Sequence, residues 1–279
     1  MTSNQKQYTS FLFILFGILF YISYENSSFA LDKIDIKTNV PEKINPVPFV
    51  PQYPKGKFEY IVITEGCNFD SLGLCISAHS GPGEKNEKVY ELETGMIFKI
   101  KSKEEKNGQI WYHVHFDEQL RYPDRTVKDW YIPAVAGRVV SDNGEEVLSS
   151  FTPATSKRII VDLSDHMIYA YDGDKLFMTT KVATGVKDAP TPLGTFTIYK
   201  KTPSRYMQGP LPGVTDTPFD LPGVPWNMYF TKDGAVIHGA YWHDRYGTNQ
   251  SNECINLPPE LAKILYDWAP LGTVVTIQN

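Results

Sequence analysis

The sequence predicts a mainly β protein with two globular domains and one clear helix. Short runs of alternating apolar and polar residues recur along most of the chain, and turns rich in Gly and Pro separate them. Only residues 259–268 read as a helix, which would begin at Pro258-Pro259, where the fixed φ of proline and its missing N–H are tolerated. The length of 279 residues allows two modest domains, each with its own core.

Residues 1–30 are expected to be a signal peptide. Twelve largely apolar residues, Phe11 to Ile22, follow Lys6, and Ser28-Phe29-Ala30 resembles a small-residue cleavage site. A spanning helix needs about 20 apolar residues, so a retained anchor is the less favoured alternative. We therefore expect an exported protein of the periplasm or cell envelope, which would meet the membrane only through an uncleaved signal segment.

Residues 31–57 are expected to form a spacer. They carry five prolines and show little periodicity. Spaced prolines favour an extended, semi-rigid chain. The alternative is an arm that packs on the domain that follows.

Residues 58–140 are predicted to be a small all-β domain. Alternation is visible in Tyr60–Ile63, Met96–Ile100 and Trp111–Phe116. The run Cys75–Gly83, followed by Gly95-Met96, Trp111-Tyr112 and Asp129-Trp130-Tyr131, resembles the bacterial SH3-like domain. That resemblance implies a small β-barrel that serves as a cell-wall binding or spacing module.

A polar linker, residues 141–156, precedes a second set of predicted strands. These strands are Arg158–Leu163, Met167–Tyr171, Lys175–Ala183, Thr195–Tyr199, Trp226–Phe230, Ala235–His238 and Thr273–Ile277. Residues 201–225 contain six prolines and have neither a helical nor a strand period. We predict that they form a lid or binding loop.

The segment from Val236 to Leu257 carries the candidate chemistry, because it holds two of the six histidines and one of the three cysteines. Its spacing suits a strand that ends at His238, an irregular loop, and a return to Cys254 at the start of the helix. A cysteine attacks as the thiolate, so it needs a nearby base, and imidazole suits that task near neutral pH. Cys67 and Cys75 lie eight residues apart and could form a disulfide in an exported protein, which leaves Cys254 as the odd thiol.

This segment resembles the catalytic signature of the YkuD-type L,D-transpeptidases. The pattern is His-Gly or His-Ser, a loop of a dozen or more residues, then Ser/Thr-His-Gly-Cys, a hydrophobic residue, and Asn or Arg. His238-Gly239 and Ser251, Cys254, Ile255 and Asn256 fit it, whereas Asn252-Glu253 stands where the family has His-Gly. The resemblance extends upstream and covers residues 157–279, through Asp162-Leu163, Gly185, Pro190–Phe196 and Pro225-Trp226.

The resemblance implies a β-sandwich catalytic domain with one C-terminal helix and no cofactor, acting on the tetrapeptide stems of peptidoglycan. Cys254 would attack the third stem residue and release D-alanine, with His238-Gly239 completing the catalytic group. The thioester would pass to an amine, giving a 3-3 crosslink or an anchored protein, or to water in a carboxypeptidase. Expected substrate-binding residues are Ser251, Asn256, Trp242, Tyr229, His243 and Glu253.

Two other readings remain open. His238, His243, Glu253 and Cys254 are all possible zinc ligands, although the family pattern favours no metal. A cell-wall binding protein with an impaired transpeptidase domain is the other alternative, because of Asn252-Glu253. Nucleic acid is not an expected partner, since the net charge is −5 and no basic run stands out.

Overall fold

The computed structural model describes residues 57–68, 75–114, 116, 120–126, 129–149, 155–213 and 215–279. The predicted signal peptide, residues 1–30, and all of the predicted spacer except Lys57 lie outside the described residues. Within the described part of the chain, no helix has the length and apolar character needed to cross a membrane.

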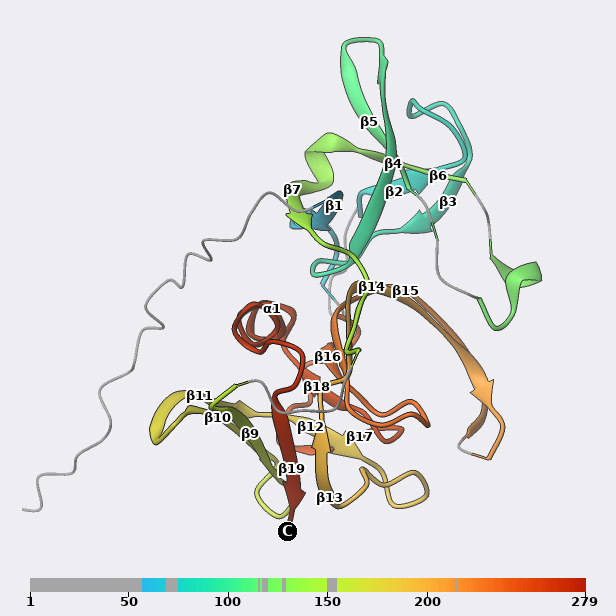
Figure 1. Cartoon of the computed structure of the whole chain (residues 1–279). Coiled ribbons are helices and arrows are strands. Elements are labelled where there is room, and N and C mark those ends of the chain that lie inside the picture. Colours follow the sequence, from blue (N-terminus) through green and yellow to red (C-terminus); the bar gives the residue numbers. More distant parts are fainter. Residues whose placement is uncertain are drawn as a thin grey trace, which may run out of the picture. The chain divides into compact units, whose positions relative to one another are not determined.

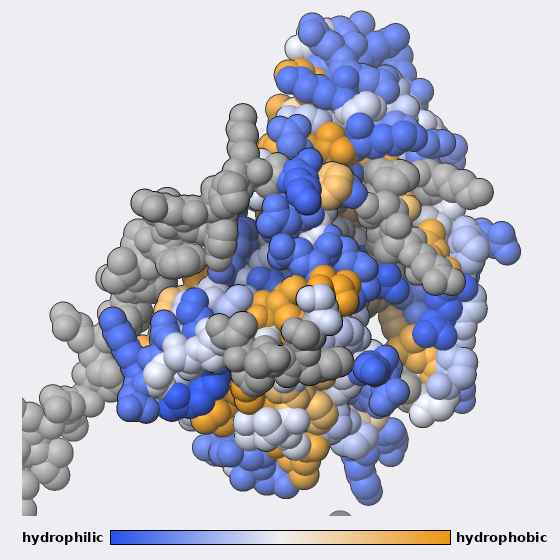
Figure 2. All heavy atoms as spheres, in the orientation of Figure 1, coloured by the Kyte–Doolittle hydropathy of each residue, from blue (hydrophilic) through white to orange (hydrophobic). Residues whose placement is uncertain are grey.

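The N-terminal domain is built on seven strands in the order β3-β2-β6-β5-β4-β1-β7 (Figure 1). The strands are β1 (Phe58–Ile63), β2 (Ser77–His79), β3 (Lys88–Glu91), β4 (Ile97–Lys106), β5 (Gln109–Val114), β6 (Trp130–Pro133) and β7 (Gly137–Asp142), with short 3₁₀ turns η1 (Pro123–Arg125) and η2 (Ala134–Ala136). Trp111, Trp130 and Phe98 fill its core. The β prediction is confirmed here, while the SH3-like assignment stays a prediction. Figure 2 shows that hydrophilic residues cover the end of the β4–β5 hairpin.

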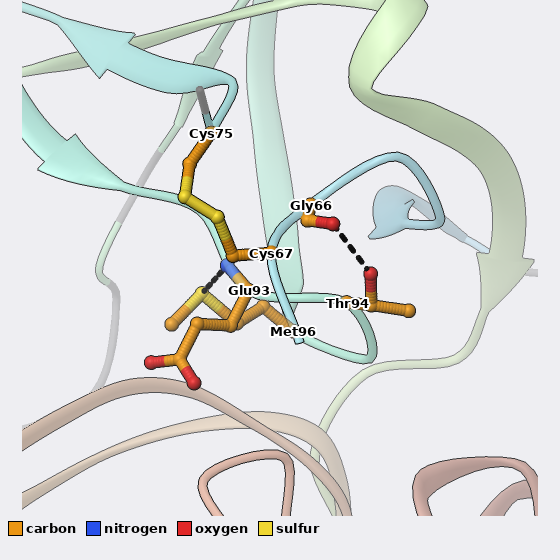
Figure 3. Close-up of a disulfide and its surroundings, with 6 residues drawn as sticks. All are labelled: Gly66, Cys67, Cys75, Glu93, Thr94 and Met96. Atoms are coloured by element: carbon orange, nitrogen blue, oxygen red, sulfur yellow. Dashed lines mark hydrogen bonds between the residues drawn. A yellow bond between two sulfur atoms is a disulfide. The ribbon is translucent and has the colours of Figure 1, made fainter. Parts of the chain in front are cut away.

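Cys67 and Cys75 form the predicted disulfide (Figure 3). Their Cα atoms lie 5.2 Å apart, within the range that a disulfide spans. The backbone of Cys67 also bonds to Leu92 and Thr94, so the bridge is tied to the turn that leads into β4. Thr94 in turn donates its hydroxyl to the Gly66 carbonyl at 3.0 Å.

The C-terminal domain packs two sheets against each other. One has the order β11-β10-β9-β19-β13 and the other the order β17-β12-β18-β16-β15-β14-β8. The strands are β8 (Glu146–Val147), β9 (Lys157–Asp162), β10 (Met167–Asp172), β11 (Lys175–Lys181), β12 (Ala183–Gly185), β13 (Gly194–Thr197), β14 (Lys200–Leu211), β15 (Thr215–Tyr229), β16 (Val236–Gly239), β17 (Thr248–Ser251), β18 (Ile255–Leu257) and β19 (Val274–Gln278). The predicted sandwich with one helix is thus confirmed.

The core lies between these sheets and under the helix α1 (Pro259–Trp268). Ile159 and Val275 from one sheet meet Ile237 and Ile255 from the other in one buried cluster, which also takes Leu265 of α1. The helix begins at Pro259, as the sequence predicts. Its start directly after β18 holds the strand that follows Cys254 against the core.

Lys201 of β14 closes the far end of α1. Its Nζ donates to the carbonyls of Tyr266 and Ala269 at 2.7 and 2.8 Å, which satisfies helix carbonyls that lack intrahelical partners. Burial lowers the pKa of this lysine to about 8, although Glu146 and Asp142 oppose that shift.

The prediction of an irregular loop at residues 201–225 is wrong, because most of this segment forms the β14–β15 hairpin (Figure 1). Only Met228 and Tyr229 of β15 pair with β16, and only Lys200 and Lys201 of β14 pair with β8. Beyond them the two strands pair only with each other, with register shifts after Arg205 and Gly209. Prolines are tolerated at such edges and bulges, and they hide the strand period in the sequence.

The hairpin is fastened to the N-terminal domain by residues near η1. The Arg125 guanidinium donates to the carbonyls of Gly209 and Phe219 at 2.6 and 3.0 Å and pairs with Asp220 at 2.9 Å. The amide of Gln208 accepts from the backbone N–H of Tyr122 and donates to its carbonyl. These contacts fix the ribbon whose base packs beside the candidate site.

Candidate active site

Two adjacent parallel strands bring the motif together. β16 carries His238, and β18 follows Cys254, with His238 opposite Asn256 in the register. Cys254 stands directly before β18 and two residues before Asn256, so from the strand period of two we expect its side chain on the face that His238 and Asn256 occupy. Between Cys254 and α1 lies the short strand β18, which was not predicted from the sequence.

His238 is buried and hydrogen-bonded at both ring nitrogens. Its Nδ1 lies 2.9 Å from the Gly239 carbonyl, and its Nε2 lies 2.9 Å from the side-chain Nδ2 of Asn256. Burial lowers its pKa to about 4, the Gly239 carbonyl partly opposes this, and His243 adds to it. His238 is therefore neutral at pH 7, with its Nε2 lone pair in the position of a base.

His243 joins the same group from the loop after β16. Its Nε2 lies 3.2 Å from Oδ1 of Asn256, so one amide links two imidazoles. Only 7% of His243 is exposed. Burial lowers its pKa, the bond to Asn256 opposes that shift, and of the flanking charges Arg245 lowers the pKa while Asp244 raises it.

The Cys254 thiol is neutral as well. It keeps some exposed surface, yet protein atoms surround most of it, and this desolvation raises its pKa to about 11. A hydrogen bond from the Val236 backbone lowers the pKa in part, and the charge of Glu253 raises it further. Thiol and imidazole thus rest as a neutral pair rather than as a thiolate and an imidazolium.

The turn before Cys254 is held by the loop that follows β12. The Val186 N–H donates to the Ser251 carbonyl at 2.9 Å, and the Glu253 N–H donates to the Ala189 carbonyl at 3.0 Å. The hydroxyl of Ser251 donates to the carbonyl of Cys254. The Glu253 N–H is therefore engaged within the protein in this conformation, which leaves the Cys254 N–H as the expected donor to an oxyanion.

Glu253 takes a left-handed backbone conformation, with φ of 71°. This is the region that glycine adopts without steric penalty and that other residues rarely enter. The turn thus keeps the backbone shape that suits the glycine of the family pattern, although glutamate occupies the position. Asn252 beside it is exposed.

A cavity of about 490 Å³ opens next to Glu253. Its walls come from Pro192, β13 and the turn between β15 and β16, and the lining residues include Thr195, Thr197, Asp233 and Glu253. The rings of Phe196, Tyr199 and Phe230 also line it, and Lys232 lies among the hydroxyls and carboxylates. A mainly apolar cavity with a few hydroxyl and charged groups is typical of a small-molecule site.

Gly239 has no room for a side chain. A Cβ there would lie 2.8 Å from Cγ of Pro225 and 2.9 Å from Cα of Pro259. The glycine lets β16 approach both β15 and the start of α1, and its carbonyl then faces His238.

The remaining predicted residues differ in their surroundings. Trp242 lies beside the base, with its ring centre 5.8 Å from that of His238. Tyr229 lies 6.5 Å from Tyr199 between ring centres, and Lys200 approaches its ring at 5.1 Å. Their roles in substrate binding stay predictions.

The sequence reasoning missed how His243 and Asn256 act on His238, and it missed the loop that holds the turn. Gly185 and Thr191 shape that loop: a Cβ on Gly185 would meet the Ala189 carbonyl at 2.4 Å, and Thr191 accepts the Gly185 N–H at 2.9 Å. The segment Gly185 to Thr191 is part of the family resemblance, but nothing local in it predicts contact with residues 251–253. Across the described ranges, no three or more His, Cys, Asp or Glu side chains are grouped to hold a metal ion.

Residues 156–277 match the family model of YkuD, the L,D-transpeptidase catalytic domain. Among solved structures, the catalytic domain of an L,D-transpeptidase from E. faecium is 29% identical, with a TM-score of 0.39 over 46% of this chain and 99% of that one. An L,D-transpeptidase from Mycobacterium smegmatis is 17% identical, with a TM-score of 0.42 over 61% and 91%. L,D-transpeptidase 3 from Mycobacterium tuberculosis is 15% identical, with a TM-score of 0.42 over 64% and 98%. A comparison with curated proteins found no match.

Proposed function

We propose that this chain, whose residues 156–277 match the family model of the YkuD L,D-transpeptidase catalytic domain, is an exported cysteine enzyme that acts on the tetrapeptide stems of peptidoglycan. The observation that supports the proposal is the pairing of β16 with β18, which sets His238 opposite Asn256, two residues after Cys254. The disulfide between Cys67 and Cys75 supports export, because such bonds persist in oxidising compartments.

The first half-reaction begins from a neutral thiol. Sγ of Cys254 attacks the carbonyl carbon of the third stem residue while Nε2 of His238 takes the thiol proton. The C–N bond to the terminal D-alanine then breaks, and His238 returns the proton to the leaving amine. The product is a thioester on Cys254.

The low pKa of His238 and the high pKa of Cys254 both disfavour a preformed ion pair. Proton transfer therefore accompanies attack, once the substrate is in place. For this step His238 exchanges the amide donor of Asn256 for the thiol. Bound substrate supplies the driving force for this proton transfer. Because the resting thiol stays protonated, it reacts slowly with other electrophiles.

The second half-reaction transfers the acyl group to an amine. The acceptor amine attacks the thioester carbonyl, His238 takes the amine proton, and the thiolate of Cys254 leaves and is reprotonated. Glu253 and Asp233 line one cavity with Lys232, and the carboxylate of Glu253 would attract the ammonium form of the acceptor, which loses a proton to solvent before it attacks. An amine of a neighbouring stem gives a 3-3 crosslink, and a lysine of a wall protein gives an anchored protein.

Incubation of the protein with disaccharide-tetrapeptide tests this proposal. We expect release of D-alanine and a mass adduct on Cys254, with crosslinked product when stem amines are present. Cys254→Ala should abolish both while the protein stays folded. Full turnover by Cys254→Ala would contradict the cysteine mechanism.

Two alternatives give different products in the same experiment. A carboxypeptidase would release D-alanine and form tripeptide with no crosslink. A cell-wall binding protein with an impaired site would form no adduct, and Asn252-Glu253 is the feature that favours this reading. Gain of an adduct by Asn252→His with Glu253→Gly would then identify the impairment.

A further inference from the structure

A buried row of hydrogen-bonded polar groups includes His238. The Gly239 carbonyl, His238, Asn256 and His243 follow one another at hydrogen-bond distances of 2.9, 2.9 and 3.2 Å. His238, Asn256 and His243 are each at most 7% exposed. Such a buried network is strong only when every donor meets an acceptor.

The hydrogen-bond donors and acceptors of this row can be assigned one after another, starting from the Gly239 carbonyl. The Gly239 carbonyl can only accept, so Nδ1 of His238 carries its proton and Nε2 bears the lone pair. The amide of Asn256 must then present its N–H to Nε2, which turns its Oδ1 toward His243. Nε2 of His243 therefore carries a proton, and its Nδ1 has no hydrogen-bond partner among the described residues.

We propose that His243 is a positioning residue for the base: its Nε2–H fixes the orientation of the Asn256 amide, and the amide fixes His238 as the tautomer whose Nε2 can accept a proton. His243 acts through Asn256 rather than on the substrate. The inference rests on the proposed function for the role of His238 as base, but the hydrogen-bond pattern itself does not depend on it.

The alternative orientation of the amide shows what His243 prevents. With Oδ1 toward His238, the imidazole would lie between two oxygen acceptors, Oδ1 and the Gly239 carbonyl. Two acceptors favour the doubly protonated ring, which cannot take the thiol proton. Loss of the residue that fixes the tautomer of a catalytic histidine costs up to about 10⁴-fold in rate.

Among the described residues, protonated His243 would lower the pKa of His238, whereas Asp244 and Arg245 shift the pKa of His243 in opposite directions. The state of His238 is therefore governed mainly by burial and by the direction of the amide.

NMR of the ¹⁵N-labelled imidazoles in the whole chain tests the inference directly. We expect His238 with a proton on Nδ1, His243 with a proton on Nε2, and both rings neutral at pH 8. This measurement on the wild-type protein tests the proposal without any variant. A neutral His243 ring with its proton on Nδ1 and none on Nε2 would overturn the proposal.

Two variants of His243 separate positioning from packing. His243→Leu removes the donor, so the protonation midpoint of His238 should rise by about 1 pH unit or more, and acylation of Cys254 should slow by about tenfold or more. His243→Gln keeps an N–H near the place of Nε2 and should restore both values to near wild type. Equal behaviour of the Gln and Leu variants, or an unchanged His238 midpoint in the Leu variant, would overturn the inference. Wild-type protein with the expected tautomers but no acylation would overturn the proposed function and leave the row intact.

Discussion

The two sides of Cys254 are built in opposite ways. On the side of β16 and β18, His238, Asn256 and His243 are buried and bonded to one another. On the side of the turn after β17, Asn252 is exposed and Glu253 holds a left-handed conformation that glycine adopts more easily. One side depends on hydrogen bonds inside the core, and the other on a strained turn at the surface.

This difference explains how the site can depart from the family pattern and still keep a base. The replaced residues, Asn252 and Glu253, lie on the turn, whereas the residues that hold His238 lie on the buried side. The influence of the turn on the nucleophile is electrostatic, since the charge of Glu253 raises the pKa of the Cys254 thiol. We therefore expect substitutions on the turn to change reactivity, and substitutions on the buried side to change both reactivity and stability.

Asn256→Leu should have the largest effect. It leaves Nε2 of His238 and the Nε2–H of His243 without partners in the core, so the free energy of unfolding should fall by about 2–4 kcal/mol. Acylation of Cys254 should fall by about 100-fold or more, since the base loses its orientation. Urea denaturation and the rate of adduct formation measure the two effects.

Asn252→Leu is the matched control for that substitution. It makes the same chemical change on the exposed turn, and its effect on stability should stay within about 0.5 kcal/mol. Equal losses in the two variants would show that the buried side and the turn are not distinct.

The next largest effect should come from buried His238, whose titration makes the free energy of unfolding depend on pH. His238 has a pKa of about 4 in the folded chain and about 6.5 when unfolded, so between these values only the unfolded chain binds the proton. Stability should therefore rise by roughly 3 kcal/mol as pH rises from 4 to 6.5, and be lost as pH falls through that window.

Titration of Asp142 changes the free energy of unfolding with pH in the opposite direction to that of His238. Asp142 must therefore be substituted before the effect of His238 can be measured. Burial raises its pKa to about 6, so its protonated form stabilises the folded chain at low pH, and that stabilisation is lost as pH rises through about 6. Asp142→Asn should give a steeper rise of unfolding free energy between pH 4 and 6.5. Adding His238→Gln should flatten it, and a slope that survives both substitutions would assign the effect to other groups.

Local features of the sequence predict several parts of this molecule. The position of α1 follows from Pro258-Pro259, and the motif with His238 and Cys254 identifies the candidate site. The disulfide follows from the number and spacing of the cysteines. Each of these depends on residues that lie close together in the chain or on a pattern that a family shares.

Features set by pairing of distant segments are not predictable in the same way. The link between His243 and His238 depends on the register of β16 with β18, which places Asn256 opposite His238. The β14–β15 hairpin could not be predicted, because its prolines interrupt the strand pattern in the sequence. They lie at edges and bulges, where the hydrogen bonds between the strands do not need their N–H. Its contacts with Arg125 join residues more than 80 positions apart, and no local pattern signals them.

Removal of the Cys67–Cys75 disulfide tests whether a change in the N-terminal domain affects the candidate site. Cys67→Ser with Cys75→Ser should lower the free energy of unfolding by about 2–3 kcal/mol, because the unfolded chain gains freedom. The rate of Cys254 alkylation should stay at the wild-type value, since the backbone of Cys67 is bonded to Leu92 and Thr94 of the N-terminal domain. A large change in that rate would mean that the N-terminal domain controls the site.

Glu253→Gly should have a small, favourable effect on stability and a clear effect on reactivity. Glycine relieves the left-handed conformation at φ of 71°, so the free energy of unfolding should rise by about 1 kcal/mol. It also removes a charge that raises the pKa of Cys254, so the thiol should alkylate at lower pH. The pH shift should be modest, because desolvation is the larger cause of the raised pKa.

Glu253→Gln separates the charge from the backbone strain at this position. It removes the charge but keeps a Cβ in the left-handed conformation, so it should lower the alkylation pH with no gain in stability. If Glu253 also attracts the acceptor amine, both variants should use stem amines less well while D-alanine release continues. Unchanged acceptor use with faster acylation would instead mean that the glutamate only restrains the nucleophile. Asn252→His with Glu253→Gly should then show the lowest alkylation pH of all, because an imidazole beside the thiol favours the thiolate.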